Sequence, residues 1–112
     1  MLFRSEGTTS NLFLVRRGRL ETPALSCGLL EGITRDVVIR LARKAGHPVR
    51  ERRLAIVDLK KADEIFLTST TLEIVPVSRV RGPSMSWSGR PGPVVRQLQE
   101  LFQAYVEREL RR

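Results

Sequence analysis

Apolar residues in this chain either alternate in short runs or recur at helical spacing, which predicts a mixture of strands and helices. Short apolar runs predict five strands, at residues 11–16, 19–22, 49–55, 64–68 and 73–81. Helical spacing predicts two main helices and one short helical turn, at about 34–45, 93–110 and 57–62. No internal repeat or linker separates these elements. They therefore predict one mixed α/β (α+β) unit, in which a mixed sheet packs against two main helices.

Single residues indicate where these elements turn, end or dock. Arg17-Gly18 suits a tight hairpin turn, and Gly46 followed by Pro48 is a typical end of a helix. Pro76 predicts a sheet margin or a bulge, because proline cannot donate a ladder hydrogen bond. In the first helix one face is apolar and comprises Val38, Leu41, Ala42 and Ala45. In the terminal helix the stripe expected to dock onto the sheet comprises Val94, Leu98, Leu101 and Tyr105.

Size and composition favour a single globular domain. The chain has 112 residues, of which 41% are hydrophobic, enough for one modest core. No apolar run approaches the roughly 20 residues that span a bilayer, and Met1-Leu2-Phe3-Arg4 is not followed by a signal-peptide core. Cys27 is the only cysteine, which favours a reducing, cytoplasmic setting. His47 has no second His or Cys near it in the sequence, so we expect no metal site.

The chain is strongly basic, with a net charge of +8 that comes mostly from arginine. Such a charge suggests binding to nucleic acid or another polyanion. The arginines, however, are scattered over every predicted element, and only 5% of the residues are aromatic and able to stack on bases. We therefore expect no dedicated nucleic-acid binding. A non-catalytic basic binding module remains an alternative, and its affinity would fall steeply with salt.

The most informative segment is Ser5-Glu6-Gly7-Thr8-Thr9-Ser10-Asn11, which directly precedes the first strand. Its small and hydroxyl-bearing residues offer N–H and O–H donors and a backbone that can approach a flat ligand closely. Glu6 has no cation next to it in the sequence. A carboxylate held against a ring nitrogen is how a protein keeps a pyridinium protonated. The alternative is an ordinary turn with a solvated glutamate.

Two further turns could hold an anion. Gly32-Ile33-Thr34 opens the first helix, where unpaired N–H groups and the helix dipole favour negative charge. Ser69-Thr70-Thr71 follows an apolar strand and offers three consecutive hydroxyls with their amides. Each turn also has a purely structural explanation, because Thr34 suits a helix cap and Ser and Thr are common in β-turns.

Three segments together resemble the second half of class IV aminotransferases, the fold-type IV enzymes that depend on pyridoxal 5'-phosphate. The segments are residues 5–13 (SEGTTSNLF), 26–35 (SCGLLEGITR) and 66–76 (FLTSTTLEIVP). Branched-chain aminotransferases, D-amino-acid aminotransferases and aminodeoxychorismate lyase belong to this family. The resemblance covers nearly the whole chain, and it implies the C-terminal half of the D-amino-acid-aminotransferase-like fold.

The resemblance implies how the first two segments would contact the cofactor ring. Glu6 would face the pyridine nitrogen and keep it protonated, so that the ring can accept electrons. Ser10 and Asn11 would line the face of the ring, and Leu30 would pack against it as an apolar wall.

The resemblance also implies how the cofactor phosphate would be held. Gly32, Ile33 and Thr34 would bind it through the start of the helix and the Thr34 hydroxyl. Thr70 would add a second hydroxyl. Thr71 and its amide would lie near the phosphate and the carboxylate of the substrate.

One departure from the family concerns the lysine that forms the Schiff base, which in these enzymes lies in the first half of the chain. Lys44, Lys60 and Lys61 are the only lysines, and each lies in a predicted polar, solvated position, whereas a cofactor-bearing lysine is normally desolvated. We therefore expect residues 1–112 to form a single C-terminal cofactor-binding domain whose N-terminal domain is absent. Alone, this chain should be inactive.

The whole enzyme would transfer an amino group between an amino acid, branched-chain or related, and a 2-oxo acid. It would be a homodimer. Aminodeoxychorismate lyase is the alternative within the family. A ligand-free remnant that self-associates through an exposed interface is a further alternative.

Overall fold

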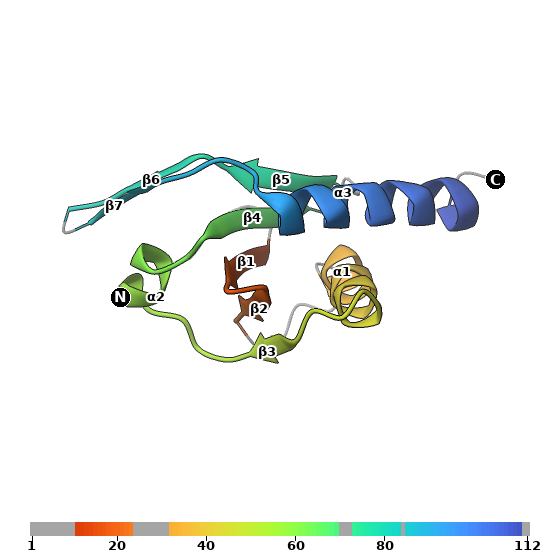
Figure 1. Ribbon diagram of the computed structural model, residues 1–112, viewed down its shortest axis with the longest axis horizontal. Coiled ribbons are helices and arrows are strands. Elements are labelled where there is room, and N and C mark those ends of the chain that lie inside the picture. The colour runs from red at the N-terminus through yellow and green to blue at the C-terminus, as the bar shows by residue number, and fades with distance from the viewer. Residues whose placement is uncertain (1–10, 24–31, 70–72, 84, 111–112) are drawn as a thin grey trace.

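A five-stranded mixed sheet forms the centre of the protein in a computed structural model, which describes residues 11–23, 32–69, 73–83 and 85–110. The sheet order is β3-β2-β1-β4-β5, and its strands are β1 Asn11–Arg16, β2 Arg19–Thr22, β3 Val49–Glu51, β4 Glu64–Ser69 and β5 Glu73–Val77. Three helices and a terminal π-helical turn surround it: α1 Gly32–Lys44, α2 Ile56–Lys60, α3 Pro93–Tyr105 and η1 Val106–Leu110. A separate two-stranded sheet contains β6 Arg79–Arg81 and β7 Ser86–Ser88. Figure 1 shows this arrangement, and the predicted mixed sheet with two main helices is confirmed.

The first hairpin forms as its local sequence predicts. Arg17 and Gly18 both have positive φ, 52° and 78°, the combination that a two-residue hairpin turn requires. The carboxylate of Asp63 accepts a hydrogen bond of 2.7 Å from the Arg17 N–H. This contact ties the turn to the segment that enters β4.

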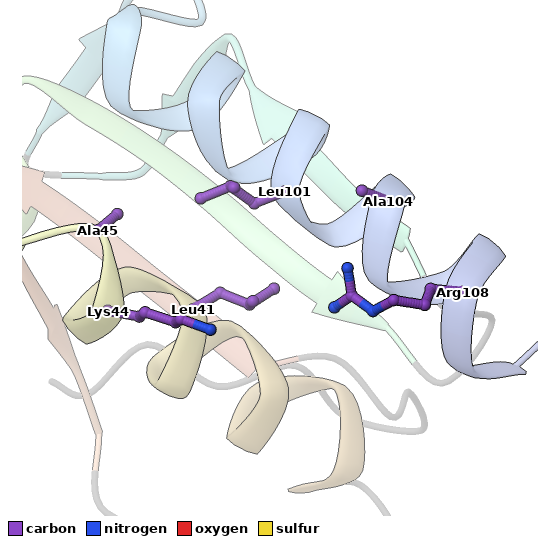
Figure 2. A pocket seen from close by; sticks show the side chains of 6 residues that line it. All are labelled: Leu41, Lys44, Ala45, Leu101, Ala104 and Arg108. Carbon is purple, nitrogen blue, oxygen red and sulfur yellow. The ribbon is translucent and has the colours of Figure 1, made fainter.

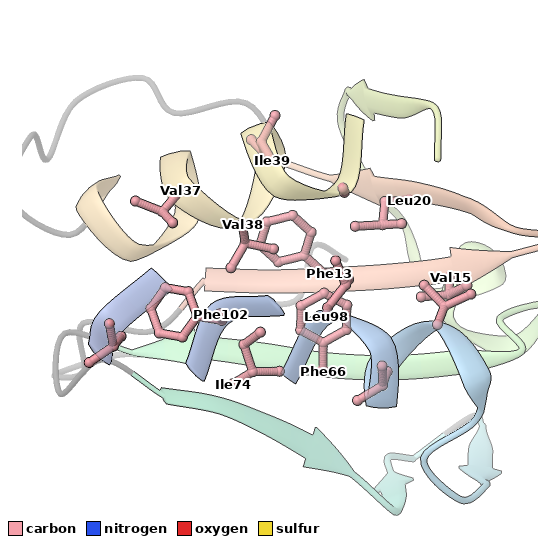
Figure 3. Close-up of a cluster of buried hydrophobic side chains, with 14 residues drawn as sticks. Phe13, Val15, Leu20, Val37, Val38, Ile39, Phe66, Ile74, Leu98 and Phe102 are labelled. Atoms are coloured by element: carbon pink, nitrogen blue, oxygen red, sulfur yellow. The ribbon is translucent and has the colours of Figure 1, made fainter. Parts of the chain in front are cut away.

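One face of the sheet packs against α1 and α3 (Figure 3). Phe13 of β1 and Phe66 of β4 are cross-strand partners, and their fully buried rings stack with centroids 4.9 Å apart. Buried residues of both helices cover them. This helix-side core comprises Phe13, Val15, Leu20, Val37, Val38, Ile39, Ala42, Phe66, Ile74, Val94, Val95, Leu98, Phe102 and Val106.

The opposite face of the sheet has a smaller core beneath α2 and the β6–β7 hairpin. It comprises Leu12, Leu14, Leu54, Leu59, Ile65 and Trp87. The indole of Trp87 donates a hydrogen bond of 2.9 Å to the carbonyl of Ala62. This bond fastens the hairpin to the segment that follows α2.

Two predicted strands are shorter than their sequence patterns suggest. The predicted strand at 49–55 ends at Glu51, where its partner β2 ends at Thr22. The N–H of Arg52 makes one more bond of 3.0 Å to the carbonyl of Thr22, and its side chain binds carboxylates on β2 and α2. The predicted strand at 73–81 breaks at Ser78, and its second part pairs with β7, which the sequence did not predict. Pro76 lies in β5, an edge strand of the sheet, as predicted.

The predicted helix faces are largely confirmed. Helix α1 begins at Gly32, two residues earlier than predicted; its Val38 and Ala42 are fully buried. In α3 the buried stripe begins with Val94 and Leu98 as predicted. It then continues through Phe102 into η1, whereas the predicted Leu101 and Tyr105 lie partly buried at its side.

An ion-pair network closes the edge of the sheet where β3 ends. The guanidinium of Arg52 donates to Glu21 at 2.8 Å and to Asp58 at 2.7 Å. Partial burial raises the pKa of the Asp58 carboxyl, but hydrogen bonds from the Ala55 N–H and Arg52 outweigh it and leave the pKa below its ordinary value. The hydrogen bonds of Arg52 to Asp58 and to Glu21 raise the pKa of its guanidinium. The folded chain therefore stabilises the ionised form of Asp58 more than the unfolded chain does.

The lowered pKa predicts how acid acts on this network. The contribution of Asp58 to stability is complete above its unfolded-state pKa, about 4, and is lost as the pH falls through the lower folded-state pKa. Replacing Asp58 by asparagine should therefore cost about 0.5–1.5 kcal/mol at pH 7 and progressively less below pH 4. Urea unfolding at several pH values measures this difference. A cost that stayed constant down to pH 3 would contradict it, and the exposed Glu100→Gln serves as a control.

Candidate functional site

The described ends of β1, β4 and α1 meet at one end of the molecule. Strand β1 begins at Asn11 and runs antiparallel to β4, so that Asn11 lies opposite Thr68. Strand β4 then ends at Ser69, which pairs with Glu73 at the start of β5. Figure 3 shows the start of α1 toward this same end of the sheet. The three segments that the sequence singled out are therefore attached to elements that begin or end at the same end of the sheet.

Asn11 is the only predicted ring-contact residue within the described ranges, and it is half-buried. Its cross-strand partner Thr68 is fully buried, and in the described part of the chain the Thr68 hydroxyl has no hydrogen-bond partner. A buried hydroxyl without a partner costs free energy, so its presence needs an explanation. Thr68 directly precedes the predicted phosphate turn at 69–71.

The predicted phosphate-binding residues at the start of α1 lie in its first turn. The backbone of Gly32 and Ile33 is helical, and Thr34 is buried, with a relative exposure of 3%. This turn contains no acidic residue that would compensate the helix dipole. The first N–H groups of a helix have no partner within the helix itself, and together with the helix dipole they favour an anion.

Five predicted site residues lie outside the described residues: Glu6, Ser10, Leu30, Thr70 and Thr71. Their contacts with a cofactor or substrate remain predictions. The structure describes the elements next to them in the chain, which are β1, α1, β4 and β5.

Two residues at this end of the molecule were missed by the sequence reasoning, Thr68 and Arg35. Arg35 follows Thr34, and its side chain has a relative exposure of only 3%. Its Nε is buried without a hydrogen-bond partner among the described residues. The pair Thr34-Arg35 was visible in the sequence, but nothing local indicated that the arginine would be buried. Arg35 Nε and the Thr68 hydroxyl are thus two buried donor atoms without a partner among the described residues at this end of the sheet.

None of the three lysines is buried. Lys44, Lys60 and Lys61 are all exposed, as their polar surroundings predicted. Lys44 lines an open groove of about 240 Å³ between α1 and α3, opposite Arg108 (Figure 2). An amine in such a position keeps its water shell and lacks the desolvation typical of a Schiff-base lysine.

His47 has a structural environment. Its ring nitrogens lie 3.0 Å from the carbonyl of Gly18 and 2.6 Å from Oε1 of Gln97. Across the described ranges, no group of three or more His, Cys, Asp or Glu side chains gathers as metal ligands would. Nor does any described helix combine the length and apolarity needed to cross a membrane.

Comparison with known proteins identifies relatives over almost the whole chain. A family model for class IV amino-transferases matches residues 3–80. A probable branched-chain-amino-acid aminotransferase of Thermotoga maritima is 46% identical over 101 residues, which cover 90% of this chain and 37% of the relative. A D-alanine aminotransferase of Listeria monocytogenes is 38% identical over 104 residues, which cover 93% of this chain and 36% of the relative.

The fold agrees with a solved relative. The branched-chain amino acid aminotransferase of Thermobaculum terrenum, in its PLP form, superposes with a TM-score of 0.73 and 39% identity over 91% of this chain and 34% of its own. The chain thus spans about a third of the length of the relatives it matches. The family match includes all three segments identified in the sequence, and the chain belongs to the class IV aminotransferase family.

Proposed function

We propose that the whole protein is a pyridoxal-phosphate-dependent aminotransferase and that this chain is its C-terminal, cofactor-binding part. The observation that carries the proposal is the family match over residues 3–80, which contains every predicted cofactor contact. It is supported by the fold, because the elements that carry these contacts begin or end at one end of the sheet.

The donors at this sheet end fit a phosphate monoester. The first turn of α1 presents the N–H groups of a helix start and a buried threonine, Thr34, and it contains no acidic side chain. Arg35 and Thr68 add buried donor atoms without partners in the described ranges. Thr70 would complete the phosphate contacts. A doubly charged phosphate is the kind of ligand that a helix start and buried donor groups stabilise.

The remaining predicted residues would act on the cofactor ring. Pyridoxal phosphate, when bound, supplies an electron sink for chemistry at the carbon that bears the amino group. Glu6 would hold a proton on the pyridine nitrogen, Asn11 and Ser10 would orient the ring, and Leu30 would exclude water from one side. Thr71 would orient the carboxylate of the substrate.

The Schiff-base lysine, we propose, lies in a part of the protein outside this sequence. All three lysines present are exposed, and the relatives are about three times as long as the matched region. The boundary of a C-terminal domain at 1–112 is part of this proposal. So are a homodimeric whole enzyme and a cytoplasmic location.

Amino transfer to a 2-oxo acid is preferred over the lyase reaction. The relatives compared above are named as aminotransferases for branched-chain amino acids or D-alanine. We propose a branched-chain amino acid as the first substrate to test, because the relative of highest identity among those compared above has that name.

Pyridoxamine 5'-phosphate is the appropriate probe for cofactor binding, because it has no aldehyde that could react with exposed lysines. We expect the chain to bind it and Thr34→Val to weaken binding by about 10- to 100-fold, the loss expected for one hydrogen bond to a charged group. Thr34→Ser keeps the hydroxyl and should bind nearly as the original chain does. Titration followed by amide NMR measures all three affinities.

The same preparation tests the predicted inactivity of the isolated chain. With pyridoxal phosphate, a branched-chain amino acid and a 2-oxo acid, we expect no amino transfer. Absence of pyridoxamine 5'-phosphate binding, or equal affinity in Thr34→Val, would contradict the assigned phosphate site. Turnover by this chain alone would contradict the proposed external lysine.

A further inference from the structure

Arg35 connects the first turn of α1 to two other elements. Its Nη2 donates a hydrogen bond of 3.1 Å to the carbonyl of Pro23, just after β2, and another of 2.7 Å to the carboxylate of Glu51 at the end of β3. Its Nη1 lies 3.5 Å from Asp36. A planar guanidinium can make these contacts together because its donors point in several directions. The start of α1 is therefore tied to the β2–β3 side of the sheet.

The position of this cation is unfavourable for the helix itself. Backbone dipoles place a partial positive charge at a helix start, where a cation is destabilising and an anion is stabilising. Arg35 nevertheless has only 3% relative exposure, and its Nε has no partner within the described ranges. Its carboxylate partners Glu51 and Asp36 are 41% and 67% exposed, so water weakens both ion pairs.

A bound anion would explain this arrangement. A phosphate in front of the first turn would be attracted both by the helix dipole and by the buried guanidinium. It would also depend on the turn being held still, because amide contacts require a fixed direction of each N–H. Two hydrogen bonds from Arg35 to separate elements provide that restraint.

We propose that Arg35 is a positioning residue, which holds the first turn of α1 against Pro23 and Glu51 in the geometry that binds the cofactor phosphate. This inference rests on the proposed function and names a residue on which that site depends. The contact on which this role chiefly depends is the hydrogen bond between Arg35 and Glu51. Glu51 is the last residue of β3, outside the predicted site.

The test uses Arg35→Lys, which keeps the charge and removes the guanidinium fork, and Glu51→Gln, which removes the charge of its partner. Each should weaken pyridoxamine 5'-phosphate binding by about 2- to 10-fold, the loss expected when one hydrogen bond that holds the turn is broken. The double variant should lose little more than either single variant, because both changes break one contact. Wild-type affinity in Arg35→Lys, or losses that simply multiply in the double variant, would overturn the proposal.

Two controls separate positioning from a general loss of stability. Arg40→Lys changes an exposed arginine of the same helix and should bind normally. Val38→Ala removes methyl groups from the core and destabilises the fold without touching the Arg35 contacts. An equal loss of affinity in Val38→Ala would overturn the proposal.

A second measurement does not depend on cofactor binding. Backbone order parameters from amide relaxation should fall at Ile33, Thr34 and Arg35 in the Arg35→Lys and Glu51→Gln variants, and should remain unchanged in the middle of α1. If the original chain binds no pyridoxamine 5'-phosphate, the proposed function fails. The order parameters of the variants then decide by themselves whether Arg35 holds the first turn in place. Unchanged order in the first turn would overturn that role, even if the cofactor binds.

Discussion

Replacing Phe66 by alanine is expected to lower the free energy of unfolding by about 3–5 kcal/mol, the largest effect of any substitution discussed here. Phe66 lies at the centre of the helix-side core, with no exposed surface, and stacks on its cross-strand partner Phe13. The interior cannot collapse fully around the lost ring, so both the burial of the ring and the packing of its neighbours are lost. For a domain with 5–15 kcal/mol of total stability, this is a large fraction.

Urea unfolding followed by circular dichroism measures this cost as a lower transition midpoint with an unchanged slope. Phe13→Ala should have a similar cost. The double variant should cost less than the sum by about 0.5–1.5 kcal/mol, because the ring pair is already lost in each single variant. Val57→Ala, at a position that is 52% exposed, is the matched control and should change stability by less than about 0.5 kcal/mol. A Phe66→Ala cost as small as this control would contradict the assigned core.

The second large effect is expected at Glu64, whose buried carboxylate caps helix α3. Its oxygens accept hydrogen bonds from the backbone N–H groups of Gly92 at 2.8 Å, Val95 at 2.9 Å and Val94 at 3.3 Å. Helix α3 has no capping side chain at Gly92 itself. The carboxylate of β4 therefore satisfies donors at the helix start and matches the positive end of its dipole.

Replacing Glu64 by alanine should cost about 2–4 kcal/mol, because buried N–H groups lose a charged acceptor. Glu64→Gln keeps one acceptor oxygen and should cost about 1–2 kcal/mol. Urea unfolding measures both, and faster hydrogen exchange at Val94 and Val95 would localise the effect to the start of α3. Glu100→Gln removes an exposed carboxylate of the same helix and is the control. An equal cost in Glu64→Gln and Glu100→Gln would contradict the cap.

Gly92 provides an independent check of the same contact. A Cβ added there would lie 2.7 Å from Cδ and 2.8 Å from Oε2 of Glu64, too close for either atom to remain in place. Gly92→Ala should therefore destabilise the protein by displacing the carboxylate from its three donors. In the Glu64→Ala variant the added methyl group meets no carboxylate. Gly92→Ala should therefore lower the free energy of unfolding much less there than in the original chain. Additive costs would show that the methyl group acts elsewhere.

Elements with local signals could be predicted from the sequence. The Arg17-Gly18 turn depends on two adjacent residues with positive φ, and the end of α1 depends on Gly46, whose φ is 94°. The apolar faces of α1 and α3 follow from spacing within each helix. Pro76 correctly indicated an edge strand, because it cannot donate to a further neighbour.

Elements that depend on distant partners could not be predicted from local patterns. The strand at 49–55 is cut short because its partner strand β2 ends at Thr22, opposite Glu51. Strand β7 pairs with β6, and Trp87 in it packs in the smaller core and donates to the carbonyl of Ala62, which lies far away in the sequence. Glu64 begins a strand predicted at 64–68, and only the tertiary structure brings its carboxylate to the start of α3.

By itself, the sequence determined the class of fold, the order of most elements and three short segments whose residue types are typical of a bound phosphate and ring. These follow from residue chemistry and from periodicity within a few residues. The tertiary structure decided that the elements carrying those segments meet at one sheet end, and that Arg35 and Thr68 are buried there with unpaired donor atoms. The reason is physical: burial and hydrogen bonding are set by residues far apart in the chain, and no local pattern records them.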